Sequence, residues 1–138
     1  MKRTLTLVAL MAAAAIPATS SADSASKATA SKGGNDLKVK FDLISLGNKP
    51  KRIEDFKFKN FTVFCAVGGP VDASGTLSRM NVNDAGKFDG NARNGDAKVH
   101  VEGEVKQNGN KVVGILKSSG DFGGGAENCK TKVGWEAS

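Results

Sequence analysis

The chain has 138 residues, with 20 Lys and Arg against 14 Asp and Glu, one His and two Cys. This length is enough for one domain and too short for two. The composition excludes a polytopic membrane protein, a large cofactor-dependent enzyme, a coiled coil and a Cys-dense scaffold. With 17 glycines and no Tyr, the chain is expected to form a small, glycine-rich β domain.

The N-terminus has the three parts of a secretory signal peptide. Lys2 and Arg3 form a positively charged start, residues 5–16 are apolar, and small residues lead up to Ala22. The apolar run of about twelve residues is shorter than the ~20 residues that a transmembrane helix needs. We therefore predict cleavage after Ala22, with Ala25 as the alternative site. The protein is then secreted and has no transmembrane segment after cleavage.

The segment after the predicted cleavage site differs in composition from the rest of the chain. Residues 23–35 consist mostly of Ser, Ala, Lys and Gly. Such a segment buries too little apolar surface to offset the entropy that is lost on ordering. The sequence therefore predicts a signal peptide at 1–22, a flexible leader at 23–35 and one β domain at 36–138.

Apolar and polar residues alternate in the first half of the predicted domain. The alternation runs through residues 37–43 and recurs at 56–59, with lysines at the polar positions. A period of two is typical of half-buried strands. Residues 61–67 form an almost continuous apolar run that predicts a central strand. The best candidate for a helical turn is the segment 51–56.

The second half of the domain consists of predicted strands joined by short turns, and these strands fall at 71–82, 87–93, 98–107, 112–116 and 129–137. The dipeptide Asn108-Gly109 is the strongest hairpin signal in the chain. Its register is open. A two-residue loop places Val105 opposite Val112, and a three-residue loop places Val105 opposite Val113.

Seven or eight short strands with turns between them predict an all-β fold. The two candidate architectures are a single antiparallel β-sandwich and a small open barrel, with one disulfide in either case. Gly75, Gly90, Gly103 and Gly114 lie inside predicted strands. Glycine at such a position often marks a bulge or a sharp bend, which suits a strongly curved sheet.

A set of motifs covers residues 36–138: Cys65 before a Gly-Gly loop, Gly75-Thr76-Leu77, Gly86-Lys87-Phe88-x-Gly90, and a closing Cys129 followed by Trp135 and Ala137. Together with the signal peptide, this combination resembles uncharacterised secreted β-rich proteins of soil actinobacteria. The resemblance implies a secreted β domain. It carries over no activity and no functional residue.

Cys65 and Cys129 are predicted to form a disulfide, because two cysteines in a secreted chain usually pair. The bond would close a loop of about 65 residues and stabilise the fold by about 4 kcal/mol. The chain has no CxxC spacing that would favour redox chemistry. We therefore expect a structural bond.

His100 is the only imidazole, and alternation places it beside Glu102 and Glu104 on a polar strand face. Three ligands in one row converge poorly on a metal ion, which favours a solvated face. Residues 81–92 superficially match a calcium loop, but Ala92 stands where a bidentate Glu is needed, and a hairpin explains the same residues. We expect no catalytic, metal-binding or cofactor-binding residue, and no cofactor.

Lys38, Lys40, Lys57 and Lys59 would form one basic face if their two strands are neighbours. Solubility and protection of sheet edges are the alternative explanation for these lysines. The functional interpretation is contact with an anionic polymer of the cell envelope. Secretion argues against nucleic acid as the partner.

Three functions are compatible with the sequence. The leading hypothesis is a secreted, non-enzymatic β-sandwich module that binds or coats, with another secreted protein as one candidate partner. The second is retention at the cell envelope through Lys-rich faces on anionic polymers. The third is a small secreted hydrolase with His100 and either Glu102 or Asp121, which we consider the weakest because the chain has no catalytic constellation.

Overall fold

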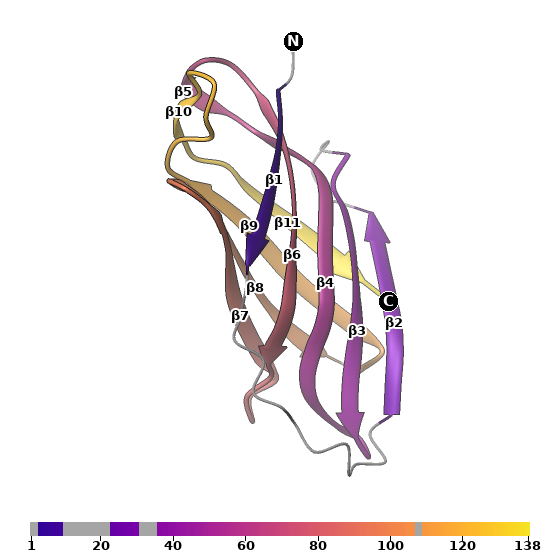
Figure 1. Ribbon diagram of the computed structural model, residues 1–138. Helices are drawn as coiled ribbons and strands as arrows, with labels where there is room; N and C mark the ends of the chain where they lie inside the picture. The colour runs from indigo at the N-terminus through magenta and orange to yellow at the C-terminus, as the bar shows by residue number, and fades with distance from the viewer. Residues whose placement is uncertain (1–2, 10–22, 31–35, 107–108) are drawn as a thin grey trace.

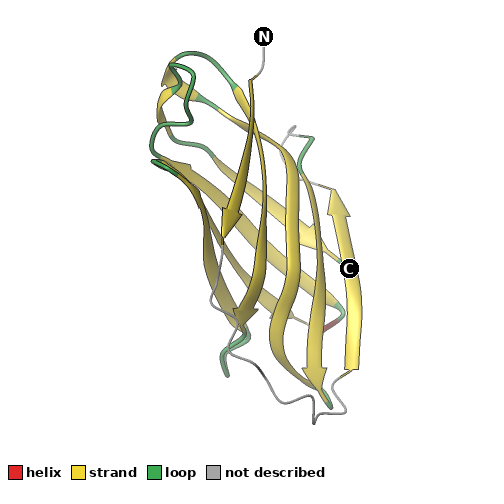
Figure 2. Ribbon diagram, viewed as in Figure 1, coloured by secondary structure: helices red, strands yellow, loops and turns green. Residues whose placement is uncertain are grey.

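The computed structural model describes residues 3–9, 23–30, 36–106 and 109–138, which form eleven strands and no α-helix (Figure 1; Figure 2). In chain order the strands are β1 (Arg3–Ala9), β2 (Asp23–Ala30), β3 (Lys38–Leu46), β4 (Lys49–Val63), β5 (Cys65–Val67), β6 (Val71–Asn81), β7 (Lys87–Asn94), β8 (Ala97–Lys106), β9 (Lys111–Ser119), β10 (Glu127–Cys129) and β11 (Lys132–Ala137). No helix within these described segments is long and apolar enough to cross a membrane.

Nine of the described strands form one sheet, in the order β11-β9-β8-β7-β1-β6-β4-β3-β2. The sheet folds back on itself into two layers. Figure 1 shows β6, β4, β3 and β2 in front, with β7, β8, β9 and β11 behind them. The ladder of β1 with β6 is parallel, and the other ladders between described strands are antiparallel. The sheet is not closed into a barrel. The prediction of an all-β, sandwich-like fold with one disulfide is confirmed.

The predicted alternation in the first strand of the domain is confirmed. Leu37, Val39, Phe41 and Leu43 are at most 2% exposed. The lysines between them are exposed. Because side chains alternate between the two faces of a strand, this segment covers the core with one face and meets water with the other.

β4 is 15 residues long, and local bulges keep its apolar side chains on one face. Its ladders shift register next to Asp55 and Asn60, which have φ of 50° and 58°. Asp and Asn adopt this left-handed conformation more readily than most residues. An extra residue shifts the pattern by one place, so Ile53, Phe56 and Phe61 are all fully buried. The helical turn predicted at 51–56 is therefore wrong.

Trp135 of β11 lies between the two layers and joins their cores. Its ring centroid is 5.7 Å from those of Phe41 on β3 and Phe56 on β4, and 6.4 Å from that of Phe88 on β7. Trp135 is only 2% exposed. Aromatic contacts at these separations add to the hydrophobic effect of burial. The layers are therefore held face to face by one aromatic cluster.

Glycines make room for these rings. In three cross-strand pairs a glycine faces an aromatic residue: Gly75 with Phe58, Gly103 with Phe88, and Gly114 with Trp135. The ladder of β8 with β9, which contains Gly103 and Gly114, runs without a register shift. These two glycines therefore mark no bulge, which was one of the two features expected at such positions. An aromatic ring that packs over a cross-strand glycine is a known device for stabilising sheets.

Replacement of Gly114 by Ala is expected to destabilise the fold by about 1–3 kcal/mol. The added Cβ would overlap the indole ring of Trp135 and lie 2.7 Å from the backbone oxygen of Glu102. Gly134→Ala is the matched control, because its Cβ would have only an ordinary contact of 3.8 Å. Urea unfolding of both variants measures the difference. Equal stability of the two variants would contradict this packing role.

The chain leaves the main sheet after Val63, so the predicted central strand at 61–67 is wrong in its second half. Phe64 is 59% exposed and Val67 is 54% exposed. β5 pairs with β10 in a separate two-stranded ribbon. The predicted last strand is likewise divided into β10 and β11. The apolar composition of residues 61–67 does not indicate that the last of them pair with β10 in the separate ribbon.

The register of the β8–β9 hairpin is the one expected for the two-residue loop. Val105 is the partner of Val112, and Gly103 is the partner of Gly114. Asn108 of the predicted turn lies outside the described residues. This register points Val101 and Leu116 into the core, where both are fully buried. Burial therefore selects a register that the apolar run at 112–116 leaves open.

The N-terminal segments differ from the sequence expectation. Arg3–Ala9, part of the predicted signal peptide, forms β1 beside β6, and its Leu7 is fully buried. Asp23–Ala30, predicted to be flexible, pairs with β3 as β2 through the backbone, which even a segment rich in small residues can do. The predicted cleavage site and residues 31–35 lie outside the described residues. Apart from Leu7, the buried core cluster comes from Leu37 onward.

Candidate anion-binding face

The four lysines singled out from the sequence lie together on the outer face of the front layer. Lys38 is the register partner of Lys59, and Lys40 is the register partner of Lys57. Directly opposite residues of an antiparallel pair have Cβ atoms about 4.5–5.5 Å apart. All four side chains are exposed. The strands are therefore neighbours, as a single basic face requires, and we call these four residues the Lys quartet.

The position of the Lys quartet argues against a role in edge protection. β3 lies between β2 and β4, and β4 lies between β3 and β6, so neither strand is a sheet edge. Like charges directly opposite each other destabilise a ladder. None of the ion pairs found among the described residues includes a lysine of the quartet. The quartet thus concentrates positive charge at a cost in stability.

A groove of about 720 Å³ extends from the Lys quartet across β6 to β1. Thr6, Ser74 and Thr76 add hydroxyl groups to its lining. Thr76 is the register partner of Lys57, so a hydroxyl lies directly beside the lysines. Ammonium and hydroxyl groups both donate hydrogen bonds to anionic oxygens. Among the described residues that line this groove, none is acidic. We call it the front groove.

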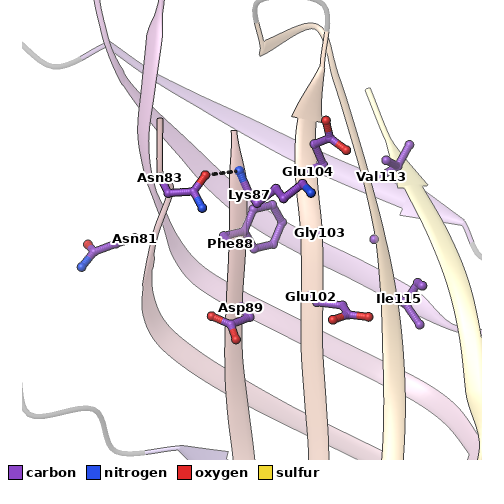
Figure 3. Close-up of a pocket in the computed structure, with 11 residues that line it drawn as sticks. Asn81, Asn83, Lys87, Phe88, Asp89, Glu102, Gly103, Glu104, Val113 and Ile115 are labelled. Carbon is purple, nitrogen blue, oxygen red and sulfur yellow. Dashed lines mark hydrogen bonds between the residues drawn. The ribbon is translucent and has the colours of Figure 1, made fainter. Parts of the chain in front are cut away.

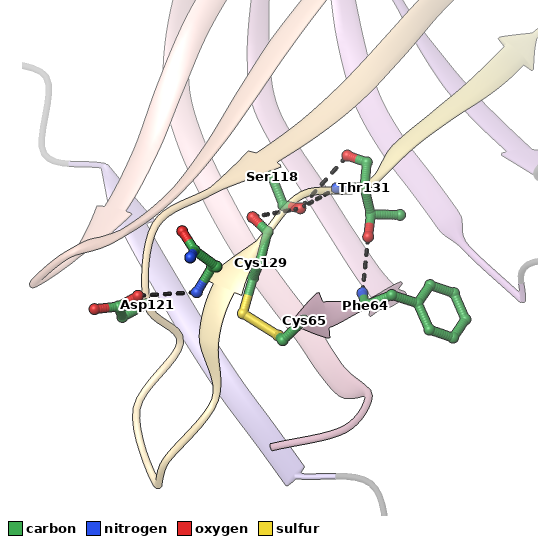
Figure 4. Close-up of a disulfide and its surroundings, with 7 residues drawn as sticks. Phe64, Cys65, Ser118, Asp121, Cys129 and Thr131 are labelled. Atoms are coloured by element: carbon green, nitrogen blue, oxygen red, sulfur yellow. Dashed lines mark hydrogen bonds between the residues drawn. A yellow bond between two sulfur atoms is a disulfide. The ribbon is translucent and has the colours of Figure 1, made fainter. Parts of the chain in front are cut away.

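The Cys65–Cys129 disulfide is confirmed, and it joins the two strands of the β5–β10 ribbon to each other (Figure 4). The two cysteines are register partners in the ribbon. Thr131 connects the ribbon to the sheet: its hydroxyl accepts a 2.7 Å hydrogen bond from the Phe64 amide, and its own amide donates to the Ser118 hydroxyl at 2.7 Å. The ribbon is therefore fixed by covalent and hydrogen bonds.

His100 lies on the outer face of the back layer, as the alternation predicts. Its Nδ1 is 2.8 Å from the side-chain oxygen of Asn91, and its Nε2 is 3.7 Å from a carboxylate oxygen of Glu102. Glu102 also accepts from Lys117 at 2.9 Å. This hydrogen bond is the main reason that the pKa of Glu102 is lowered. Asp121, the other acid weighed as a catalytic partner, accepts a hydrogen bond from the Asn128 amide at 3.0 Å.

A second groove, of about 670 Å³, lies on the back layer and was missed by sequence analysis (Figure 3). Its lining combines three acidic residues and one lysine with two half-buried apolar residues: Asp89, Glu102, Glu104, Lys87, Val113 and Ile115. The sequence did contain a signal for this groove: residues 112–116 are apolar on both faces of the strand, so some of their apolar side chains have to lie on the outer face. Within the described part of the chain, no group of three or more His, Cys, Asp or Glu is arranged to hold a metal ion.

The residues compared above with a calcium loop form a hairpin turn. The side-chain oxygen of Asn83 accepts hydrogen bonds from the amides of Ala85 at 3.0 Å and Lys87 at 2.9 Å. Asn commonly stabilises turns through such bonds to its own neighbouring backbone. Gly86, with φ of 81°, completes the turn in a conformation that favours glycine. The Asn83 oxygen is therefore already used by the backbone.

Comparisons with protein-family models, curated proteins and solved structures found no match to this chain. The structure brings together all four lysines named from the sequence and both cysteines.

Proposed function

We propose that this protein is an extracellular, non-enzymatic β-sandwich binding module that holds anionic polymers of the cell envelope through the Lys quartet. The observation that carries the proposal is the cross-strand arrangement of the quartet. Four exposed lysines occupy neighbouring positions on two internal strands, and none of the ion pairs among the described residues includes them. The arrangement does not stabilise the sheet by itself, because like charges directly opposite each other repel.

Two features support an extracellular location. A structural disulfide persists in oxidising compartments and is rare in the cytosol, and Cys65–Cys129 forms one here. The N-terminal sequence has the charged start, apolar run and small-residue site of a signal peptide. Cleavage after Ala22 would remove β1, including Leu7 and the Thr6 hydroxyl of the front groove. The Lys quartet, Ser74, Thr76 and the other residues of the core cluster lie after the cleavage site.

The surroundings of His100 favour binding over catalysis. A hydrolytic His must be held next to a nucleophile and an orienting acid. Here one ring nitrogen is bonded to Asn91, and the other is 3.7 Å from Glu102. Ser118, a hydroxyl on the neighbouring strand β9, is 6% exposed and accepts a hydrogen bond from the Thr131 amide. The side chains of His100 and Ser118 are therefore both in contact with neighbouring residues of the sheet.

The chemistry of lysine indicates an extended polyanion as the ligand. Lysine is a hydrated point charge that binds anions without the bidentate geometry of arginine. An exposed contact of this kind is weak and is screened by salt over about 10 Å at 0.1 M. Several such contacts along one polymer add up, whereas a single small anion engages only one or two of them. A linear polymer with repeated phosphate or carboxylate groups therefore suits the front groove.

Replacement of the Lys quartet by Gln is expected to weaken binding to intact cell walls at least tenfold at low salt. A lysine near an anionic membrane surface contributes about 1 kcal/mol, and the variant loses four such charges. Co-sedimentation of residues 23–138 with cell walls measures the binding, at low and at high salt. Extraction of phosphate-containing polymers from the walls then distinguishes phosphate from carboxylate ligands.

The control variant removes four exposed lysines that lie outside the front groove: Lys49, Lys51, Lys87 and Lys106. It loses the same charge as the quartet variant and is expected to retain most of the binding. If both variants lose affinity equally, net charge and not the Lys quartet causes retention. If the unmodified protein does not sediment with walls at low salt, the proposal fails, and a protein partner becomes the better explanation.

A further inference from the structure

We infer that the protein has a second anion-binding groove on its opposite face and is therefore a bivalent cross-linker of anionic polymers. This inference rests on the proposed function and extends it from binding to cross-linking. The second groove has a volume of about 460 Å³. Its lining contains four lysines, which are Lys98, Lys117, Lys130 and Lys132, together with the imidazole of His100. We call it the back groove.

Strand register builds the back groove as a row of basic residues across three strands. His100 of β8 is the partner of Lys117 on β9, and Lys117 is the partner of Lys132 on β11. Lys98 lies two residues before His100 and therefore on the same face. Ser119, the partner of Lys98, adds a hydroxyl group to the lining. The back groove thus repeats the combination of lysines and hydroxyls found in the front groove.

Three of the four lysines in the back groove form no ion pair within the described part of the chain, and one of these three, Lys132, contributes to lowering the pKa of Glu102. Lys117 is paired with Glu102 at 2.9 Å. No ion pair among the described residues includes Lys98, Lys130 or Lys132. Glu102 borders the acidic groove that also contains Asp89 and Glu104. An anion is therefore attracted to the basic end of the back layer and repelled from the acidic part.

The disulfide ribbon fixes one wall of the back groove. The Lys130 amide donates to the Phe64 backbone oxygen at 3.1 Å, and the Ser118 amide donates to the Thr131 backbone oxygen at 2.8 Å. Cys129, the residue before Lys130, is fully buried and bonded to Cys65. The position of Lys130 beside the end of β9 is thus set by covalent and hydrogen bonds.

The two basic grooves point away from each other. Val99 and Val101 are fully buried, so His100 between them faces outward from the back layer. The Lys quartet faces outward from the front layer, because the residues that alternate with it are buried. Phe41 and Trp135 pack against each other between the two layers, and Figure 1 shows these layers one behind the other. Packed sheets lie about 10 Å apart, and the side chains of both outer faces add to that separation. A short anion occupies one groove at a time, whereas two polymer chains can be held by one protein molecule.

Light scattering with long-chain polyphosphate tests the inference. At low salt the unmodified protein is expected to cross-link the polymer into large networks that scatter light. Excess polymer is expected to dissolve the networks, because each polymer chain then binds too few protein molecules to connect it to several others. Tripolyphosphate, which is too short to connect molecules, is expected to give none. The back-groove variant replaces the three lysines without an ion pair, Lys98, Lys130 and Lys132, by Gln. It is expected to bind polyphosphate but to scatter at least tenfold less.

Three outcomes decide between the claims. A back-groove variant that scatters like the unmodified protein would overturn the cross-linking inference and leave the proposed function intact. An unmodified protein that binds the polymer without forming networks would also overturn the cross-linking inference and leave the proposed function intact. The matched control here replaces three exposed lysines outside both basic grooves, Lys51, Lys87 and Lys106, by Gln. If it loses as much scattering as the back-groove variant, net charge is the cause and the inference also fails. Circular dichroism melting of each variant confirms that it is folded.

Discussion

Replacement of Trp135 by Ala is expected to lower the free energy of unfolding by about 3–5 kcal/mol, the usual cost of truncating a buried large aromatic residue. The side chain is 2% exposed and contacts rings from both layers, including Phe41 and Phe88. Its removal leaves a cavity at the junction of the layers. The rings around the cavity belong to three different strands, so they cannot collapse into it without moving the sheet.

Guanidinium unfolding of the Trp135 variant, followed by circular dichroism, measures this loss. Phe64→Ala is the matched control, because Phe64 is an aromatic residue that is 59% exposed. Its truncation is expected to change the stability by less than about 0.5 kcal/mol, as is usual for surface positions. A Trp135 variant that unfolds at the same denaturant concentration as the control would show that the two layers do not depend on this ring.

Loss of the disulfide is expected to cost about 4 kcal/mol. The two cysteines are 64 residues apart in the sequence, and a cross-link over such a loop removes chain entropy from the unfolded state. Small domains have a total stability of about 5–15 kcal/mol, so the bond supplies a large share. A variant with Cys65→Ser and Cys129→Ser is expected to unfold at much lower denaturant concentration than the oxidised protein.

Reduction of the unmodified protein provides the control for the disulfide variant. Reduced protein is expected to match the variant, because both lack the cross-link. A difference of less than about 1 kcal/mol between the oxidised protein and both reduced forms would contradict a structural role. Reduction is also expected to weaken the back groove more than the front groove, since the bonded Cys129 directly precedes Lys130.

The period of two in the sequence correctly predicts which side chains of the main strands are buried. Val39 and Phe41 turn inward, and the lysines between and beside them turn outward. The same alternation correctly assigns His100 to an outer face. These predictions succeed because the direction of a side chain depends only on the strand itself.

The arrangement of the strands could not be predicted in the same way. Proximity of Lys40 and Lys57 depends on the pairing of β3 with β4. The bulges at Asp55 and Asn60 insert residues into a pattern that the sequence shows only as irregular spacing. The back groove depends on the pairing of three strands that end at different turns. Pairing and register are long-range properties, so composition and periodicity do not determine them.

A nuclear magnetic resonance titration tests the central claim most directly, because it locates the contact on the protein. Isotope-labelled residues 23–138 are titrated with long-chain polyphosphate at low salt, with the protein in small amount to avoid networks. We expect saturable shifts in the side-chain and amide signals of Lys38, Lys40, Lys57 and Lys59 that reverse when salt is added. Unchanged quartet signals, while the protein is shown to bind the polymer, would contradict the assignment of the Lys quartet as the binding face.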